Sequence, residues 1–169
     1  WGVSRGLGDV YKRQTLSCVM FLVVNTVSAM VHLYSVGYMS HDKSKARFMA
    51  YLSFFTFAML MLVSSNNLLQ LFFGWEGVGV ASYLLIGFWY NKKSATSAAV
   101  KAFLVNRVGD LGFILGLIFV YTYFDTIMFE RIFELAPSMI DVNVVVFDNK
   151  LNVIELSCFL LFIGAMGKL

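Results

Sequence analysis

Residues 68–90 read LLQLFFGWEGVGVASYLLIGFWY, an apolar run that contains a single charged residue, Glu76. The run is long enough to cross a membrane as a helix, since about 20 mostly apolar residues cross roughly 30 Å of hydrocarbon. An ionised residue at the centre of such a helix costs at least about 2.5–3.5 kcal/mol on insertion scales. The segment therefore predicts a transmembrane helix whose single carboxylate needs a partner, water or a proton.

The composition of the whole chain is that of an integral membrane protein. Of its 169 residues, 59% are hydrophobic and only 14% are charged, and the mean hydropathy is +0.76. These values lie outside the range of soluble globular domains. The net charge of +3 is small and divided among short segments, so we expect no nucleic-acid binding. Cys18 and Cys158 lie in separate apolar runs, and we expect packing residues there rather than a disulfide or a metal site.

Further apolar stretches on both sides of the quoted run predict an all-α fold, a polytopic transmembrane helix bundle of about five spans with the last one truncated. The polar runs SSNN at 64–67 and NKKSATS at 91–97 separate neighbouring spans, and hydroxyl groups of the second run are expected to cap the next helix. The expected helices are 15–39, 48–63, 68–90, 98–124 and 152–169, with an outer loop at 125–151 that contains one short surface helix near 128–135.

The basic residues of the connections predict the orientation. The first connection contains Lys43, Lys45 and Arg47, and the third contains Lys92 and Lys93. Both lie on one side if all the spans cross, and the positive-inside rule places that side in the cytoplasm or the mitochondrial matrix. The opposite side agrees, because SSNN is uncharged and residues 125–150 contain five acidic and only two basic residues.

Residues 1–14, WGVSRGLGDVYKRQ, break this alternation because they place three basic residues on the outer side. They contain no hydrophobic run of the kind found in signal peptides. The composition changes abruptly at Thr15. We therefore expect residues 1–14 to be a foreign leader and residues 15–169 to be the transmembrane fragment.

Four ionisable residues are expected near mid-membrane depth. Glu76 lies about nine residues, or roughly 13 Å, from the outer surface, Arg107 and Asp110 lie near the middle of the fourth span, and Lys168 lies past the middle of the fifth. Arg107 and Asp110 are spaced to pair on one face of a helix, for either a structural or a functional reason. The partner of Glu76 must come from another helix, and we expect Lys168, with the shallower Lys101 as the alternative.

A buried glutamate and lysine are suited to proton transfer. Desolvation disfavours the charged form of both groups, while their mutual attraction favours it, so a small displacement of either can load or release a proton. An interhelical salt bridge that only fixes the packing is the competing interpretation. Small residues in both helices predict close helix contacts or room for water around the charges. They are Gly74, Gly77, Gly79, Ala81, Gly109, Gly112 and Gly116.

Five segments carry a resemblance to a known family. They are HLYSVGYM (32–39), RFMAYLSFF (47–55), NNLLQLFFGWEGVGVASYLLIGFWY (66–90), KAFLVNRVGDLGF (101–113) and GAMGK (164–168). In this order and spacing they resemble the antiporter-like, proton-translocating subunit 5 (NuoL-type) of respiratory complex I, the NADH:quinone oxidoreductase. The resemblance covers about residues 15–168, and GWEGVG together with NRVGD is typical of this subunit rather than of its paralogues.

The resemblance implies proton translocation across an energy-transducing membrane, either the bacterial plasma membrane or the mitochondrial inner membrane. It assigns the proton channel to Glu76 and Lys168, with Lys101, Arg107 and Asp110 as supporting charges. It also implies that the chain binds no cofactor or metal and carries no redox centre, since NADH, FMN, iron–sulfur clusters and quinone are expected in partner subunits. The expected partners are the other membrane subunits of complex I, the lipid bilayer and protons.

The chain also departs from the family pattern. It ends in GKL, where the family continues as GKS, and the family's first two helices and the later helices with further lysines are absent. We therefore expect an internal fragment that translocates no protons by itself. Three alternatives remain: the large subunit of a multisubunit sodium/proton antiporter, a relative in a membrane-bound hydrogenase, and a helix bundle whose charges serve only to assemble a complex.

Overall fold

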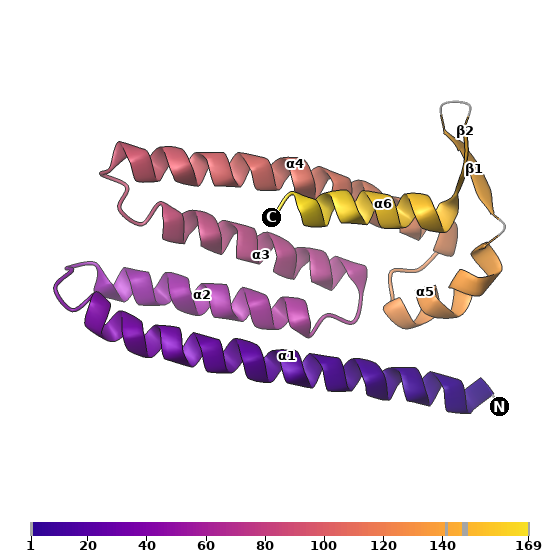
Figure 1. Ribbon diagram of the computed structural model, residues 1–169, viewed down its shortest axis with the longest axis horizontal. Helices are drawn as coiled ribbons and strands as arrows, with labels where there is room; N and C mark the ends of the chain where they lie inside the picture. Colours follow the sequence, from indigo (N-terminus) through magenta and orange to yellow (C-terminus); the bar gives the residue numbers. More distant parts are fainter. Residues whose placement is uncertain (1, 141, 147–148, 169) are drawn as a thin grey trace.

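Apolar runs separated by short polar connections fold into long helices that lie side by side (Figure 1). The computed structural model describes residues 2–140, 142–146 and 149–168, so Asp141, Asp148 and Leu169 of the expected outer loop and last helix lie outside the described residues. The long helices are α1 (Gly2–Tyr38), α2 (Lys45–Val63), α3 (Leu68–Ile86), α4 (Lys93–Phe124) and α6 (Val153–Met166). Four of them, α1 to α4, are long and apolar enough to cross a membrane, which confirms the predicted transmembrane bundle.

The helices pack mainly against their neighbours in sequence. Contacts join α1 to α2, α2 to α3, and α3 to α4, and α6 packs along α4. The 14 residues of α6 extend about 21 Å, less than a full crossing. In Figure 1 the C-terminal end of α6 therefore lies midway along the bundle, beside α3 and α4.

Several helix ends differ from the predicted ones. The helix α3 ends at Ile86 rather than at residue 90, with Gly87 as its C-cap, and Phe88 is buried in the connection that follows. The helix α4 begins at Lys93 rather than at residue 98, and its N-cap, Lys92, makes no side-chain cap hydrogen bond. The expected hydroxyl cap is wrong because Thr96 lies inside the helix and donates its hydroxyl to the Lys92 carbonyl at 3.4 Å.

The remaining boundaries are closer to the prediction. The helix α2 begins three residues earlier than expected, and α6 gives way to a turn at Gly167. The membrane-spanning part of α1, Thr15–Tyr38, matches the expected helix at 15–39. The same helix continues through residues 2–14. The foreign origin of those residues stays a prediction.

The outer connection contains the predicted short helix and also a hairpin that was not predicted. After α5 (Phe129–Leu135) and the 3₁₀ turn η1 (Ala136–Met139), strands β1 (Asn143–Val146) and β2 (Asn149–Asn152) pair antiparallel. The valine-rich β1 favours a strand because β-branched side chains fit a pleated surface. The expected outer loop with one short helix near 128–135 therefore also contains this hairpin.

An apolar core joins the outer ends of α3, α4 and α6. Its buried residues are Leu68, Val120, Phe124 and Val153. The backbone of the outer connection is also tied to the start of α3, since the Leu68 amide donates to the Ile127 carbonyl at 3.0 Å. These contacts set the depth of α6 relative to α3 and α4, and so they position the residues at its far end.

The outward faces of the bundle are apolar, as expected of surfaces in contact with lipid or neighbouring helices. Leu22, Leu33 and Val108 are 69%, 76% and 73% exposed. Cys18 and Cys158 are free and lie exposed on these faces, so the expected packing contacts are not formed within the described part of the chain. A thiol behaves as a small apolar group, which is compatible with this environment.

Candidate functional site

The antiparallel packing of α3 and α4 brings Glu76 and Arg107 to the same depth, where they form an ion pair between Arg107 Nη1 and Glu76 Oε2. The Glu76 side chain is 18% exposed and that of Arg107 is 41% exposed. The second carboxylate oxygen of Glu76, Oε1, is buried and has no hydrogen-bond partner among the described residues. One oxygen is therefore neutralised by a cation, while the other is available for a proton or a water molecule.

Asp110 lies one turn further along α4 and extends the cluster. Its Oδ2 is 4.0 Å from Arg107 Nη1, which confirms the predicted pair. Its Oδ1 accepts a hydrogen bond from Trp75 Nε1 at 3.1 Å, and the residue is 4% exposed. A carboxylate buried to this extent depends on such partners, because burying an unpaired charge is costly. Arg107 is thus shared between two carboxylates from different helices.

Lys168 completes the cluster from the C-terminal end of α6. Its ammonium donates a hydrogen bond to the Trp75 carbonyl and lies 4.5 Å from the centroid of the Trp75 ring, a cation–π contact. The expected direct pair with Glu76 is wrong: among the described residues, no carboxylate lies within 4.0 Å of Lys168. Arg107 is the partner of Glu76 instead, because it extends from α4, which packs against α3. Lys168 contacts α3 at the neighbouring residue, Trp75.

Lys101 does not join this cluster. It is exposed, and it forms no ion pair within the part of the chain that the structure describes. The alternative prediction that Lys101 pairs with Glu76 is therefore wrong. Its role as a supporting charge stays a prediction.

Glycines make room for these charges, as the sequence predicted. A Cβ atom at Gly79 would lie 3.4 Å from Lys168 Nζ, so the bare backbone of α3 leaves space for the ammonium. A Cβ atom at Gly109 would lie 2.7 Å from the Cα atom of Gly167, closer than real Cβ contacts allow. Close approach of α4 and α6 at these small residues brings Lys168 to the cluster.

Trp75 is the member of the cluster that sequence reasoning missed. Its indole N–H binds Asp110, its carbonyl accepts from Lys168, and its ring stacks on Phe113 with centroids 5.7 Å apart. A signal was present in the sequence. Tryptophan in membrane proteins gathers at the interfaces, whereas this one adjoins Glu76 at mid-depth, where its N–H needs an acceptor.

A separate polar cluster joins α1 and α2. The His32 ring bonds to the Ser28 carbonyl through Nδ1 at 2.7 Å and to Ser53 Oγ through Nε2 at 3.3 Å. Ser28 and Thr56 hydroxyls meet at 2.7 Å. No acidic residue contributes to these bonds. We therefore interpret the cluster as satisfied hydrogen bonds within α1 and between α1 and α2, while the charged groups gather around Glu76.

Two family models match the chain. One, described as the transmembrane domain of NADH:quinone oxidoreductase/Mrp antiporter, matches residues 65–169, which contain the whole charge cluster. The other, described as the N-terminus of chain 5 of NADH-ubiquinone oxidoreductase (complex I), matches residues 11–49. The second match begins inside the segment that was expected to be a foreign leader.

Curated relatives are similar over most of the chain. NADH-quinone oxidoreductase subunit L of Rhodobacter capsulatus is 58% identical over 160 residues, which cover 90% of this chain and 22% of the relative. Subunit L of Rickettsia bellii (strain RML369-C) is 55% identical over 90% of this chain and 24% of its own length. NADH-ubiquinone oxidoreductase chain 5 of Arabidopsis thaliana is 56% identical over 91% of this chain and 23% of its own. The chain thus spans about a quarter of the length of the curated relatives it matches.

Proposed function

The chain belongs to the NADH:quinone oxidoreductase/Mrp antiporter family of membrane proteins, and from this membership we propose that it forms part of a proton-translocating subunit of respiratory complex I. The observation that carries the proposal is the charge cluster of Glu76, Arg107, Asp110 and Lys168, which joins three helices around Trp75. Intramembrane charges of this kind mark ion and proton pathways. The partners of the chain are then the other membrane subunits of the complex.

In this proposal Glu76 is the group that takes up and releases the proton. While Arg107 holds Oε2, the carboxylate keeps its negative charge, and the buried Oε1, which has no hydrogen-bond partner among the described residues, is the oxygen that takes up the proton. When Arg107 moves toward Asp110, Glu76 loses its cation and binds a proton, because an unpaired buried carboxylate favours its neutral form. Arg107 is suited to this movement, since it is half-exposed and already lies 4.0 Å from Asp110.

Lys168 provides the second proton-binding group. Its ammonium is held by a neutral carbonyl and an aromatic ring rather than by a carboxylate. Such partners stabilise the charge less than an ion pair does. In this proposal a proton passes between Glu76 and Lys168, the ammonium of which contacts the neighbouring Trp75. The redox chemistry and its cofactors belong to other subunits.

The decisive experiment is Glu76→Gln in the assembled complex, with NADH-driven quinone reduction and proton uptake into vesicles as the readouts. Glutamine keeps the shape of the side chain and removes its charge and its titration. We expect a normal amount of assembled complex and a loss of proton uptake of at least about a hundredfold, the typical lower bound for removal of a positioned proton-transfer group.

The matched control is Glu155→Gln, the same change on an exposed residue in the first turn of α6. It should leave both readouts unchanged. Failure of Glu76→Gln to assemble, with normal turnover of whatever complex forms, would instead favour a purely structural role for the charges. Proton uptake that depends on Glu76 and requires a sodium gradient would favour a sodium/proton antiporter, which the family description also covers.

A further inference from the structure

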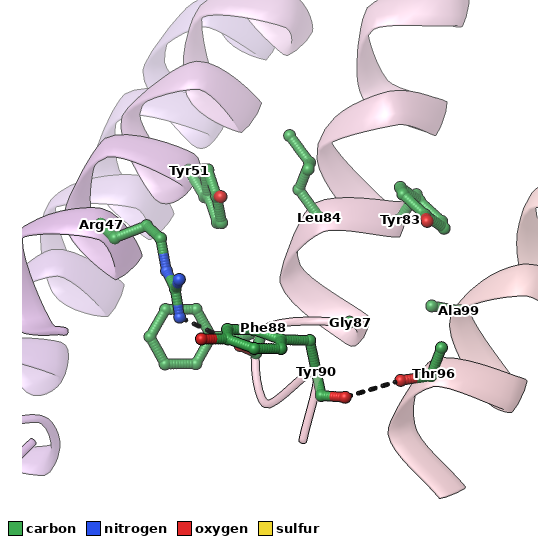
Figure 2. A pocket seen from close by; sticks show the side chains of 9 residues that line it. All are labelled: Arg47, Tyr51, Tyr83, Leu84, Gly87, Phe88, Tyr90, Thr96 and Ala99. Carbon is green, nitrogen blue, oxygen red and sulfur yellow. Dashed lines mark hydrogen bonds between the residues drawn. The ribbon is translucent and has the colours of Figure 1, made fainter. Parts of the chain in front are cut away.

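A pocket of about 210 Å³ opens at the inner end of the bundle, on the side of the basic connections. Figure 2 shows its walls: Arg47 and Tyr51 on α2, Tyr83 on α3, and Thr96 on α4, with Phe88 and Tyr90 of the α3–α4 connection between them. The pocket is well separated along α3 from Glu76. It plays no part in the proposed proton path.

Arg47 is held in this pocket by aromatic rings rather than by a counter-ion. Its guanidinium carbon lies 4.9 Å from the Phe88 ring centroid and 5.3 Å from that of Tyr90. Its Nη2 donates to the Phe88 carbonyl at 3.3 Å, while its Nε is buried without a hydrogen-bond partner among the described residues. A guanidinium has five N–H donors, so this one is fixed in place with donors unused.

The acidic residue of the neighbouring connection does not neutralise Arg47. Asp42 accepts hydrogen bonds from the Ser44 amide at 2.7 Å and from Trp89 Nε1 at 3.3 Å. No carboxylate of the described residues lies within 4.0 Å of Arg47. The pocket therefore presents a positive charge with open donors, and the planar guanidinium fits a phosphate group.

The surroundings of the pocket favour an amphipathic ligand. An open hollow next to it shares Tyr90 and Thr96 and is also lined by Lys93 and Val100. From there an exposed apolar face runs along α4 at four-residue spacing, with Val100, Leu104 and Val108 being 43%, 59% and 73% exposed. A negatively charged head between Arg47 and Lys93 would thus have its tail on apolar side chains.

We propose that Arg47 and Lys93 bind the phosphate group of an anionic phospholipid of the inner leaflet, whose acyl chains lie along the outer face of α4. Basic pockets between transmembrane helices on the cytoplasmic or matrix side suit such head groups. The site lies on that side, because the connections that border it carry the basic residues which the positive-inside rule places there. This inference does not depend on proton translocation.

The test is native mass spectrometry of the full chain, purified in neutral detergent and titrated with phosphatidylglycerol or phosphatidylcholine. We expect one phosphatidylglycerol to bind the unmodified chain in preference to phosphatidylcholine. Arg47→Gln should weaken that binding about tenfold or more, because charge-assisted hydrogen bonds to the phosphate are lost. Lys43→Gln is the matched control: it removes the same charge from the same side of the membrane, at a residue outside the pocket.

Three outcomes would overturn the proposal. They are equal weakening by Arg47→Gln and Lys43→Gln, equal binding of the two lipids, and displacement of phosphatidylglycerol by millimolar inorganic phosphate, which would identify a free anion as the ligand. Should Arg47→Gln fail to fold, Arg47→Lys keeps the charge but loses the planar fork. It should still weaken binding relative to Lys43→Gln, and unchanged binding would contradict the proposed site.

Discussion

Trp75 uses its backbone and its side chain to connect residues from two other helices. Its indole N–H reaches Asp110 on α4, and its carbonyl and ring receive Lys168 beyond the end of α6. Because the N–H is the one donor of an indole, replacing the residue by phenylalanine removes a single hydrogen bond and keeps an aromatic surface for the lysine. The contribution of that bond can therefore be measured separately.

We expect Trp75→Phe to destabilise the chain by about 1–3 kcal/mol, since it leaves the buried Asp110 short of a donor. Thermal unfolding in detergent, followed by circular dichroism, measures the change. Trp89→Phe is the control, since Trp89 also donates its indole N–H to a carboxylate, Asp42, but is 42% exposed. There water replaces the lost donor, and the expected change is under about 0.5 kcal/mol. Equal effects of the two substitutions would mean that Asp110 does not depend on the indole.

Arg107 stabilises two carboxylates, and its removal should be more costly than removal of another cation from the same helix. We expect Arg107→Gln to destabilise the chain by about 3 kcal/mol, the low end for breaking a buried pair, because the arginine is 41% exposed. Lys101→Gln removes an exposed cation of α4 that forms no ion pair with any described residue, and it should change stability by less than about 0.5 kcal/mol. Chemical denaturation in mixed micelles would compare them, and similar losses would contradict the ion pair with Glu76.

The sequence predicted which residues carry charge inside the membrane but not how they pair. Depth along an apolar run follows from counting residues, so Glu76, Arg107, Asp110 and Lys168 could be identified. Pairing depends on which face of each helix meets its neighbour and on the precise height of α6, and neither follows from one sequence. For this reason the Arg107–Asp110 pair within one helix was predicted correctly, while the partner of Glu76 was not.

At the scale of the elements, the contact between α4 and α6 is the one on which the site depends most. The glycines of α4 face α6 directly: a Cβ at Gly112 would lie 2.7 Å from Ile163 Cγ2, and one at Gly116 would lie 3.0 Å from the Leu161 side chain. Gly164 of α6 faces Phe113 in the same way. Two helices that approach this closely gain dispersion contacts that larger residues would prevent.

We expect Gly109→Ala to displace α6 and destabilise the chain by about 1–3 kcal/mol, the usual cost of overpacking. Gly37→Ala is the control, since a Cβ at Gly37 meets nothing within 4 Å and alanine is the better helix former by about 1 kcal/mol. That substitution should be neutral or stabilising. Thermal unfolding distinguishes the two cases, and a neutral Gly109→Ala would show that the two helices are not in close contact there.

The elements were predicted best where their apolar runs are long and worst at their ends. The centres of α1 to α4 follow from hydropathy alone, because in lipid only a helix satisfies all the backbone hydrogen bonds of an apolar run within that run itself. The hairpin of β1 and β2 was missed because its valine run is short and lies outside the membrane. There short-range pairing rather than hydropathy decides the structure.

At the scale of the whole molecule, the connections at the two ends of the bundle differ in charge. The basic connections after α1 and α3 lie at one end of the bundle, while the uncharged α2–α3 turn and the acidic segment with α5 and the hairpin lie at the other (Figure 1). This sorting was predicted from the sequence and follows from alternate crossings. The same arrangement determines from which end Lys168 reaches the site. The helix α6 begins at the acidic end of the bundle and places Lys168 at mid-depth.

The sorting predicts which positions a membrane-impermeant maleimide reaches in sealed vesicles of a chain in which Cys18 and Cys158 are replaced by alanine. Single cysteines at Ser40 and Asn91, both exposed in the basic connections, should react from the inner side alone. Cysteines at Ser64 and Ser138, exposed at the opposite end, should react from the outer side alone. Vesicles of opposite orientation provide the control, because they must exchange the two labelling patterns.

If Ser40 and Asn91 were labelled from different sides, α2 and α3 would not both cross. Glu76 and Lys168 would then no longer lie at the same depth. The topology alone would exclude the proposed proton path between them.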